Sequence, residues 1–328
     1  MLDRAYGALI GGAIGDAMGM PASFFTRAQI DKTYGYIEDF LEPEKSVQSY
    51  HGNLQAAEIT DDTMESVIIS QVLIENGKFS EDAFNQAMKK WAIEQKMLES
   101  TVIGPSTRRY LTALIEGRDP KETAGKGVTN GSAMRCAPIG VKYHDNLTKC
   151  IEAAASSSLP SHGSKPAVAA ACAVAAGVSM GVHGGYSTLE ILDAAASAAE
   201  YGEKAGADIT APSLSKRLKL LPVIVDSCGD APMNIILDEI VGIFGASMMA
   251  YESVALSYGA FYAVEGNGRE GVLAAINAGD DADTNGSICG NLCGAYSGAS
   301  SFPDIWKERV QKTSGLNMME TARKLLEK

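Results

Sequence analysis

The stretch DRAYGALIGGAIGDAMG, residues 3–19, predicts a helix that packs closely against other helices. Its apolar positions recur at helical spacing, Asp3 is a candidate N-cap, and Pro21 is placed to end the helix. The stretch is rich in Ala and Gly, and small residues let neighbouring helices approach one another closely. We therefore expect it to form one helix of a compact helical bundle.

Helical periodicity continues along most of the chain, and period-two strand patterns are nearly absent. Ser80 is a candidate N-cap for the helix that follows it, and the segment 221–225 is ambiguous between helix and strand. Three stretches are irregular, at 20–59, 125–140 and 159–166, and the first is long enough to be a lid or a binding loop. Further helices are predicted at 62–76, 81–96, 105–116, 146–158, 165–182, 187–203, 213–225, 232–244, 251–264, 269–278, 285–297, 303–312 and 316–327.

The bulk composition bounds the architecture and the partners. The 328 residues are 46% hydrophobic, which is ample for a sizeable core, and no Pro/Ser-rich or charged linker divides them. We therefore predict an all-α fold in a single domain over residues 1–328. The formal charge of −12, from 40 acidic and 28 basic residues, argues against binding a nucleic-acid polymer. A small phosphorylated ligand is not excluded by this charge.

The cysteines and the N-terminus favour a cytoplasmic protein. Most cysteines lie in apolar runs, so buried free thiols are more plausible than disulfides or a zinc site. The apolar N-terminus lacks the basic region of a signal peptide and carries Asp3 and Asp16. No uninterrupted apolar run is long enough to span a bilayer, so we expect no membrane partner. The six cysteines are Cys136, Cys150, Cys172, Cys228, Cys289 and Cys293.

Two acidic clusters that resemble each other stand far apart in the chain: Thr60-Asp61-Asp62-Thr63 and Asp280-Asp281-Ala282-Asp283-Thr284. Each combines carboxylates with threonine hydroxyls, and each begins a helix-like run. Oxygen ligands of this kind suit hard cations such as Mg²⁺, Mn²⁺ or Ca²⁺. Carboxylates this dense repel one another unless cations or protons neutralise them. If folding joins the clusters, the expected result is a two-metal site that activates water.

Each cluster also has a plainer explanation, namely an N-terminal helix cap. For a single cluster, a helix cap is the better explanation. A cap needs only one such residue, however, and the occurrence of two similar clusters weakens the cap explanation. The run from Asp281 to Gly286 also fits the first half of an EF-hand loop. That interpretation fails because the twelfth position, which should be Glu, is Leu292.

Other polar residues carry weaker signals. The segment Thr129–Arg135, TNGSAMR, offers flexible backbone that can approach a sugar or a phosphate closely. Arg135 is more plausible as a structural ion-pair former than as a catalyst. His162 lies in a Ser/Gly/Pro loop, and a lone histidine is usually structural. His51, His144 and His183 show no feature that singles them out.

The chain resembles the ADP-ribosylglycohydrolase family, which includes the dinitrogenase reductase-activating glycohydrolases. Matching motifs follow in order along essentially the whole chain: GALIGGAIGDAMGMP (7–21), ITDDT (59–63), TNGSAMRCAPIG (129–140), SLPSH (158–162), YESVALSYGAF (251–261) and GDDADTNGSICGNLCGAYSG (279–298). The resemblance implies a compact orthogonal multi-helix bundle with two Mg²⁺ or Mn²⁺ ions between the acidic clusters. It also implies hydrolysis of an N- or O-glycosidic bond at C1 of a ribose.

The resemblance also implies roles for individual residues. Asp62 or Asp283 would accept the proton of the attacking water, and Asp16 would support the metal ligands from behind. The substrate pocket would be lined by Asn130, Gly131, Ser132, Met134 and His162. The metal ligands would be Thr60, Asp61, Asp62, Asp281, Asp283 and Thr284.

One position departs from the family pattern. Many members carry Glu in a motif like GDALGxPxEF, and Ser23 stands at that place here, although the nearby Glu58 could substitute for it. The resemblance and this departure leave two expected substrates: an ADP-ribosyl group, including one carried by an ADP-ribosylated protein, or a smaller riboside cleaved by the same binuclear site. A member that binds a ligand without catalysis is the remaining alternative, and retention of all six candidate ligands argues against it.

Overall fold

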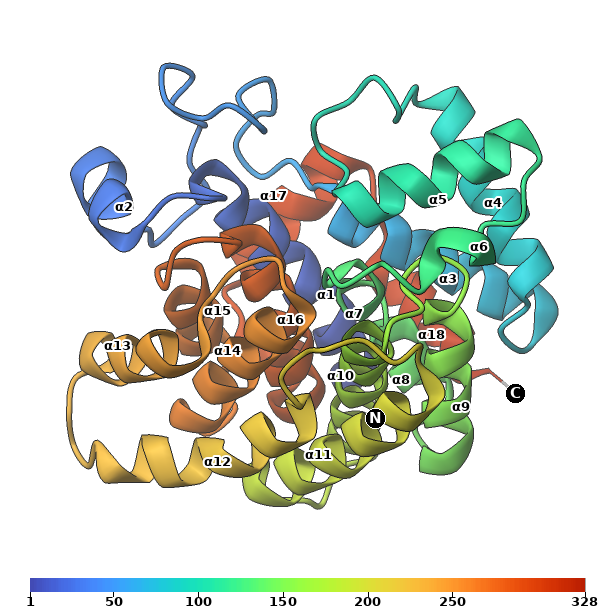
Figure 1. Cartoon of the computed structure of the whole chain (residues 1–328). Helices are drawn as coiled ribbons and strands as arrows, with labels where there is room; N and C mark the ends of the chain where they lie inside the picture. The colour runs from blue at the N-terminus through green and yellow to red at the C-terminus, as the bar shows by residue number, and fades with distance from the viewer. Residues whose placement is uncertain (328) are drawn as a thin grey trace.

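A computed structural model describes residues 1–327, and they form an all-α fold, as the sequence predicts (Figure 1). Among these residues the only β-structure is three isolated bridges. The long helices are α1 (Leu2–Gly19), α3 (Asp61–Asn76), α4 (Glu81–Glu94), α5 (Pro105–Glu116), α9 (Leu147–Ser158), α10 (Lys165–His183), α11 (Thr188–Ala205), α12 (Leu214–Ser227), α13 (Met233–Phe244), α14 (Ala250–Ala263), α16 (Ala282–Ser297) and α17 (Asp304–Ser314). The shorter helices are α2 (Arg27–Tyr34), α6 (Lys121–Ala124), α7 (Gly131–Met134), α8 (Ala137–Lys142), α15 (Gly268–Ile276) and α18 (Met318–Leu326), with 3₁₀ turns η1 (Met20–Ala22) and η2 (Ala299–Ser301).

The structure confirms most predicted helices and corrects some details. Helices α2 and α7 and most of α8 lie in stretches predicted to be irregular, and α6 lies in a stretch for which no element was predicted. These helices are too short to show a clear period. The ambiguous segment 221–225 belongs to α12. Asp3 is not a cap: Met1 occupies the N-cap of α1, and Asp3 lies in the first turn. Ser80 does cap α4, since its hydroxyl accepts a hydrogen bond from Ala83 N at 3.3 Å.

Helices α1 and α16 are antiparallel, and their backbones are in direct contact. On α1 a glycine recurs at every fourth residue from Gly7 to Gly19, and each of these four glycines faces a small residue of α16, whereas Gly12 lies off this row and faces Asn291. A Cβ atom on Gly11 would come within 2.2 Å of the Gly290 carbonyl oxygen, and one on Gly15 within 2.0 Å of the Gly286 carbonyl oxygen. The spacing places all these glycines on one face of each helix. The two helices lie side by side at the centre of the molecule (Figure 1), and no larger side chain fits between them.

This crossing determines where the acidic residues lie. Because the helices are antiparallel, the C-terminal end of α1 meets the N-terminal end of α16, where Gly19 contacts Ala282. Asp16, near the end of α1, therefore approaches the second acidic cluster. Asp16 also contacts the start of α3, which carries the first cluster.

Helix α10 corrects one expectation about apolar runs. Residues Lys165–His183 are long and apolar enough to cross a membrane by length and composition, but 89% of that window is buried inside the protein. Such burial is typical of the core helix of a globular protein. Five of the six cysteines are buried and all six are free thiols, as expected. That the chain forms a single domain stays a prediction.

Candidate active site

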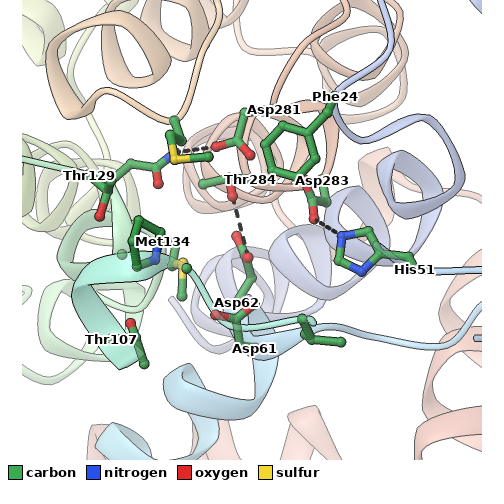
Figure 2. Close-up of a pocket in the computed structure, with 16 residues that line it drawn as sticks. Phe24, His51, Asp61, Asp62, Thr107, Thr129, Met134, Asp281, Asp283 and Thr284 are labelled. Carbon is green, nitrogen blue, oxygen red and sulfur yellow. Dashed lines mark hydrogen bonds and ion pairs between the residues drawn. The ribbon is translucent and has the colours of Figure 1, made fainter. Parts of the chain in front are cut away.

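The starts of α3 and α16 meet at one pocket, shown in Figure 2. Asp61 and Asp62 come from α3, and Asp283 and Thr284 from the first turn of α16, with Asp281 just before it. The free volume is about 50 Å³, which holds a few water-sized groups. The two acidic clusters, separated by more than two hundred residues, therefore share one small cavity.

The first cluster is held from behind by a single carboxylate. Asp16 accepts hydrogen bonds from the backbone N and the hydroxyl of Thr60, at 3.1 and 2.8 Å, and from those of Thr63, at 3.1 and 2.5 Å. Thr60 is itself the N-cap of α3, because its hydroxyl accepts a hydrogen bond from Asp62 N. Burial raises the pKa of Asp16 to about 6, although these four donors favour its charged form. The cap explanation therefore applies to Thr60, while Asp61 and Asp62 line the pocket.

The second cluster is arranged differently. Asp281 occupies the N-cap position of α16 but makes no capping hydrogen bond. Its carboxylate instead accepts a hydrogen bond from Asn130 Nδ2 at 2.6 Å. The preceding residue, Asp280, has φ of +57° and exchanges backbone hydrogen bonds with Phe24 and Phe25. A cap does not explain this cluster, because its carboxylates point to the pocket and not to the free N–H groups of the helix.

Electrostatic repulsion is concentrated in this pocket. Burial, followed by the charges of neighbouring carboxylates, raises the pKa of Asp61, Asp62 and Asp281 well above the usual range of aspartate. A hydrogen bond joins the two clusters, since Thr284 Oγ1 donates to Asp62 Oδ2 at 3.4 Å. Protons or cations are needed to keep so many buried carboxylates together.

His51 belongs to the site, and the sequence analysis did not single it out. Its Nε2 lies 3.2 Å from Asp283 Oδ2, and both side chains are buried (Figure 2). Although burial opposes ionisation, the hydrogen bond and charge of His51 lower the pKa of Asp283 below the usual value. His51 stands in the irregular stretch 20–59, where no periodicity indicates which side chains turn inward. The only sequence feature that could have pointed to His51 is that the chain has just four histidines.

Ser23 lies beside the same carboxylate. It is fully buried, and its hydroxyl makes no hydrogen bond of good geometry, although it is close enough to Asp283 to favour the charged form. Gln48 joins this segment to His51: its Nε2 donates to the Pro21 and Ser23 carbonyls, and its Oε1 accepts from His51 N at 3.4 Å. Glu58, the proposed substitute for the missing Glu, does not line this pocket. His51 lies there instead.

The residues predicted to bind substrate divide into two groups. Asn130, Gly131 and Met134 line the pocket. Ser132 does not, since its hydroxyl donates to the Ala167 carbonyl at 3.2 Å. His162 also lies outside the pocket, buried directly behind Gly131, where a Cβ atom would come within 2.8 Å of its Nε2. Burial, with the charges of nearby arginines, holds the pKa of His162 well below its usual value.

Arg135 forms a buried ion pair, as the sequence suggests. Its Nη1 donates to Glu65 Oε2 at 2.6 Å, and neither side chain is exposed to solvent. The guanidinium also donates to Ser161 Oγ at 2.7 Å and lies over the Phe84 ring. Glu65 contributes to the raised pKa of Asp61, so this ion pair lies just behind the first cluster.

The donor atoms suit a hard cation, although they do not converge on one point. Within residues 1–327, no three His, Cys, Asp or Glu side chains are placed to hold one ion as they stand. Among the carboxylates that line the pocket, Asp62 Oδ1 and Asp283 Oδ1 are buried and have no hydrogen-bond partner in the part of the chain that the structure describes. A buried, unpartnered anion is costly, and divalent cations with oxygen ligands relieve that cost. The chemistry of the donor set therefore fits the ions that the family resemblance implies.

Comparison with known proteins places the chain in a family. The family model for ADP-ribosylglycohydrolase matches residues 1–328, so the protein belongs to the ADP-ribosylglycohydrolase family. It is 28% identical to Uncharacterized protein YegU of Escherichia coli K12, over 96% of this chain and 94% of that protein. It is 26% identical to ADP-ribosylarginine hydrolase Tri1 of Pseudomonas putida GB-1, over 94% and 74% of the two chains.

A solved structure gives the same fold. The chain superposes on an ADP-ribosylglycohydrolase-related protein complex with a TM-score of 0.72, over 99% of this chain and 97% of that one. The sequences are 24% identical, so this likeness concerns the fold alone. Family membership supports a hydrolase of glycosidic bonds.

Proposed function

We propose that this protein hydrolyses the glycosidic bond at C1 of a ribosyl group with the help of two Mg²⁺ or Mn²⁺ ions. One observation carries the proposal: four buried carboxylates from distant segments line a single pocket, and three of them have a strongly raised pKa. A scaffold without a ligand has no need for such repulsion. The residues proposed to hold the ions are Thr60, Asp61, Asp62, Asp281, Asp283 and Thr284.

The roles of the side chains follow from their placement. When bound, the ions supply Lewis acidity and lower the pKa of a bound water. Asp62 and Asp283 each present a carboxylate oxygen without a partner, and either is suited to accept the proton of the attacking water. Positive charge that develops at C1 is stabilised by these carboxylates, as in other glycosidic cleavages. We propose that Asn130 and Gly131, which line the pocket, bind the ribose.

Two substrate classes fit this reaction. Tri1 of Pseudomonas putida is named as a hydrolase of ADP-ribosylarginine, which favours an ADP-ribosyl group on a protein as the substrate here. The small pocket and the neutral Ser23 beside Asp283 favour a smaller N-riboside. Substrates of both classes would be cleaved at the same carboxylates. We propose that the protein acts on its substrate in the cytoplasm.

A substrate panel tests the proposal. ADP-ribosylarginine, ADP-ribosyl protein and simple ribonucleosides are incubated with the protein in Mg²⁺, in Mn²⁺ and in EDTA, and free ribose or ADP-ribose is measured. We expect turnover of at least one compound with metal and none in EDTA. Metal binding without turnover of any compound contradicts the proposal and supports a ligand-binding role.

A further inference from the structure

Helix α12 carries a stripe of side chains that stays uncovered within residues 1–327. These side chains recur at a spacing of three or four residues, so they share one face of the helix. Leu220 is 46% exposed, and Val223 is 65% exposed, the highest fraction among the large hydrophobic residues of the described chain. The helix lies at the lower edge of the molecule in Figure 1. We call this face the α12 stripe, and it consists of Lys216, Lys219, Leu220, Val223, Asp226 and Ser227.

Charge changes sign along the α12 stripe, with the apolar side chains at its centre. Lys216 lies in the first turn of the helix and Asp226 in the last. This order opposes the helix macrodipole, which favours acidic side chains in the first turn and basic ones in the last. Lys219 lies 3.9 Å from Glu200 of α11, but within residues 1–327 no carboxylate pairs with Lys216 and no cation pairs with Asp226. Contacts within one chain therefore do not explain these charges.

The α12 stripe is complementary to itself about a twofold axis. If two copies pair their α12 helices antiparallel about the midpoint between Leu220 and Val223, each Leu220 meets the Val223 of the other copy. The same alignment brings Lys216 of one copy opposite Asp226 and Ser227 of the other. A twofold axis makes every such contact twice, so two ion pairs form at the two ends of an apolar centre. A second copy therefore matches this order of charges by symmetry, whereas an unrelated partner would match it only by chance.

We propose that the α12 stripe is the interface of a homodimer in which the α12 helices of two copies pack antiparallel. Arg217 donates to the Phe244 carbonyl at 2.7 Å, which places the exposed Ile243 of α13 beside the start of α12 and extends the apolar face. One pair of 14-residue helices buries less than the roughly 800 Å² per partner of a typical stable complex, so this dimer is reversible. Residues of other segments line the carboxylate pocket, so the proposal is independent of the proposed function.

Sedimentation equilibrium of the full chain over a concentration series tests this proposal. We expect the average mass to rise from 34.5 kDa toward twice that value as the concentration approaches about 1 mM. Val223→Glu should raise the dimer Kd about tenfold or more, because two carboxylates would be buried at the apolar centre. The matched control is Ile93→Glu on α4, which alters an isoleucine that is 56% exposed outside the stripe and should leave the Kd unchanged. Thermal melts check that each variant is folded.

An exchange of charges tests the antiparallel arrangement. Lys216→Asp and Asp226→Lys should each raise the dimer Kd about tenfold, because each creates a like-charge contact at both ends of the interface. The double variant should return the Kd to within about threefold of the wild-type value, since both ion pairs form again with their signs reversed. A protein that stays monomeric at every concentration overturns the proposal. A dimer that Val223→Glu leaves intact, or one that the double variant does not restore, also overturns it.

Discussion

The two acidic clusters both combine aspartates with threonine, but they are held in place by different means. The first is fixed from within the helical framework, where Asp16 of α1 accepts four hydrogen bonds from Thr60 and Thr63. The second depends on residues from irregular segments: Asn130 contacts Asp281, and His51 contacts Asp283. The first cluster is therefore part of the helix packing, whereas the second can be adjusted by changes in two loops.

This difference separates stability from specificity. Loss of Asp16, which holds the first cluster, should affect folding and catalysis together, because this buried carboxylate satisfies backbone N–H groups. Changes around the second should alter metal binding or substrate choice with little effect on the fold. The following predictions test that contrast, from the largest expected effect to the smallest.

Removing a carboxylate from either cluster should abolish activity while the fold survives. For Asp62→Ala and Asp281→Ala we expect activity to fall more than about 100-fold, because each removes a proposed metal ligand. Repulsion in the metal-free protein should decrease, so the melting temperature in EDTA should hold or rise, and stabilisation by Mg²⁺ should shrink. Activity assays and thermal melts with and without Mg²⁺ measure this. An unfolded mutant would instead show that these residues act as helix caps.

Asp16→Ala should destabilise the protein itself. Two buried backbone N–H groups, those of Thr60 and Thr63, lose their acceptor, which costs about 2–4 kcal/mol in the free energy of unfolding. Urea denaturation gives the value. The matched control is Asn130→Ala, which removes the corresponding partner of the second cluster. If the control is equally destabilising, the contrast between the clusters fails.

His51→Ala should weaken metal binding without unfolding the protein. The His51 contact lowers the pKa of Asp283, so its loss makes that carboxyl easier to protonate and a poorer ligand. Loss of a partner that orients a metal ligand typically costs about tenfold or more in affinity. Titration with Mn²⁺ measures the change, and His51→Gln should restore part of it. Unchanged Mn²⁺ affinity in His51→Ala refutes this role.

Without metal, the protein should become less stable as the pH rises. Burial raises the pKa of Asp61, Asp62 and Asp281, and that of Asp16 to about 6, so the folded state holds protons that the unfolded state has released. That stabilisation is complete below the unfolded pKa, near 4, and is lost as the pH rises through the folded values. Thermal melts in EDTA from pH 5 to pH 8 should show a falling melting temperature. Added Mg²⁺ should flatten the trend, and a rise with pH in EDTA is the contrary result.

Ser23→Glu should have the smallest effect, confined to substrate choice. The new carboxylate would lie beside Asp283, where Ser23 now has an uncharged hydroxyl. We expect turnover of a simple N-riboside to fall about threefold to tenfold, with weaker change for ADP-ribosylarginine. Relative kcat/KM values for the two substrates provide the test, with Ser23→Gln as the uncharged control. Strong wild-type cleavage of ADP-ribosylarginine with no turnover of any riboside contradicts this prediction.

The sequence predicted the helices well because each is long enough to repeat its apolar face several times. It also marked both acidic clusters, since carboxylates beside threonines at helix starts are visible in one dimension. It did not indicate His51, whose loop has no period, or the position of His162 behind Gly131. These facts depend on contacts between segments far apart in the chain.

The sequence by itself determined an all-α protein whose two acidic clusters begin helices, because helical period and cap chemistry are local properties. Only the tertiary structure decided that the clusters meet. The glycines of α1 and α16 allow the two backbones to make direct contact in one antiparallel register. That register brings Asp16 between Thr60 and the start of α16. Which helix a glycine-lined face selects depends on shape complementarity across the whole core, and no single segment contains that information.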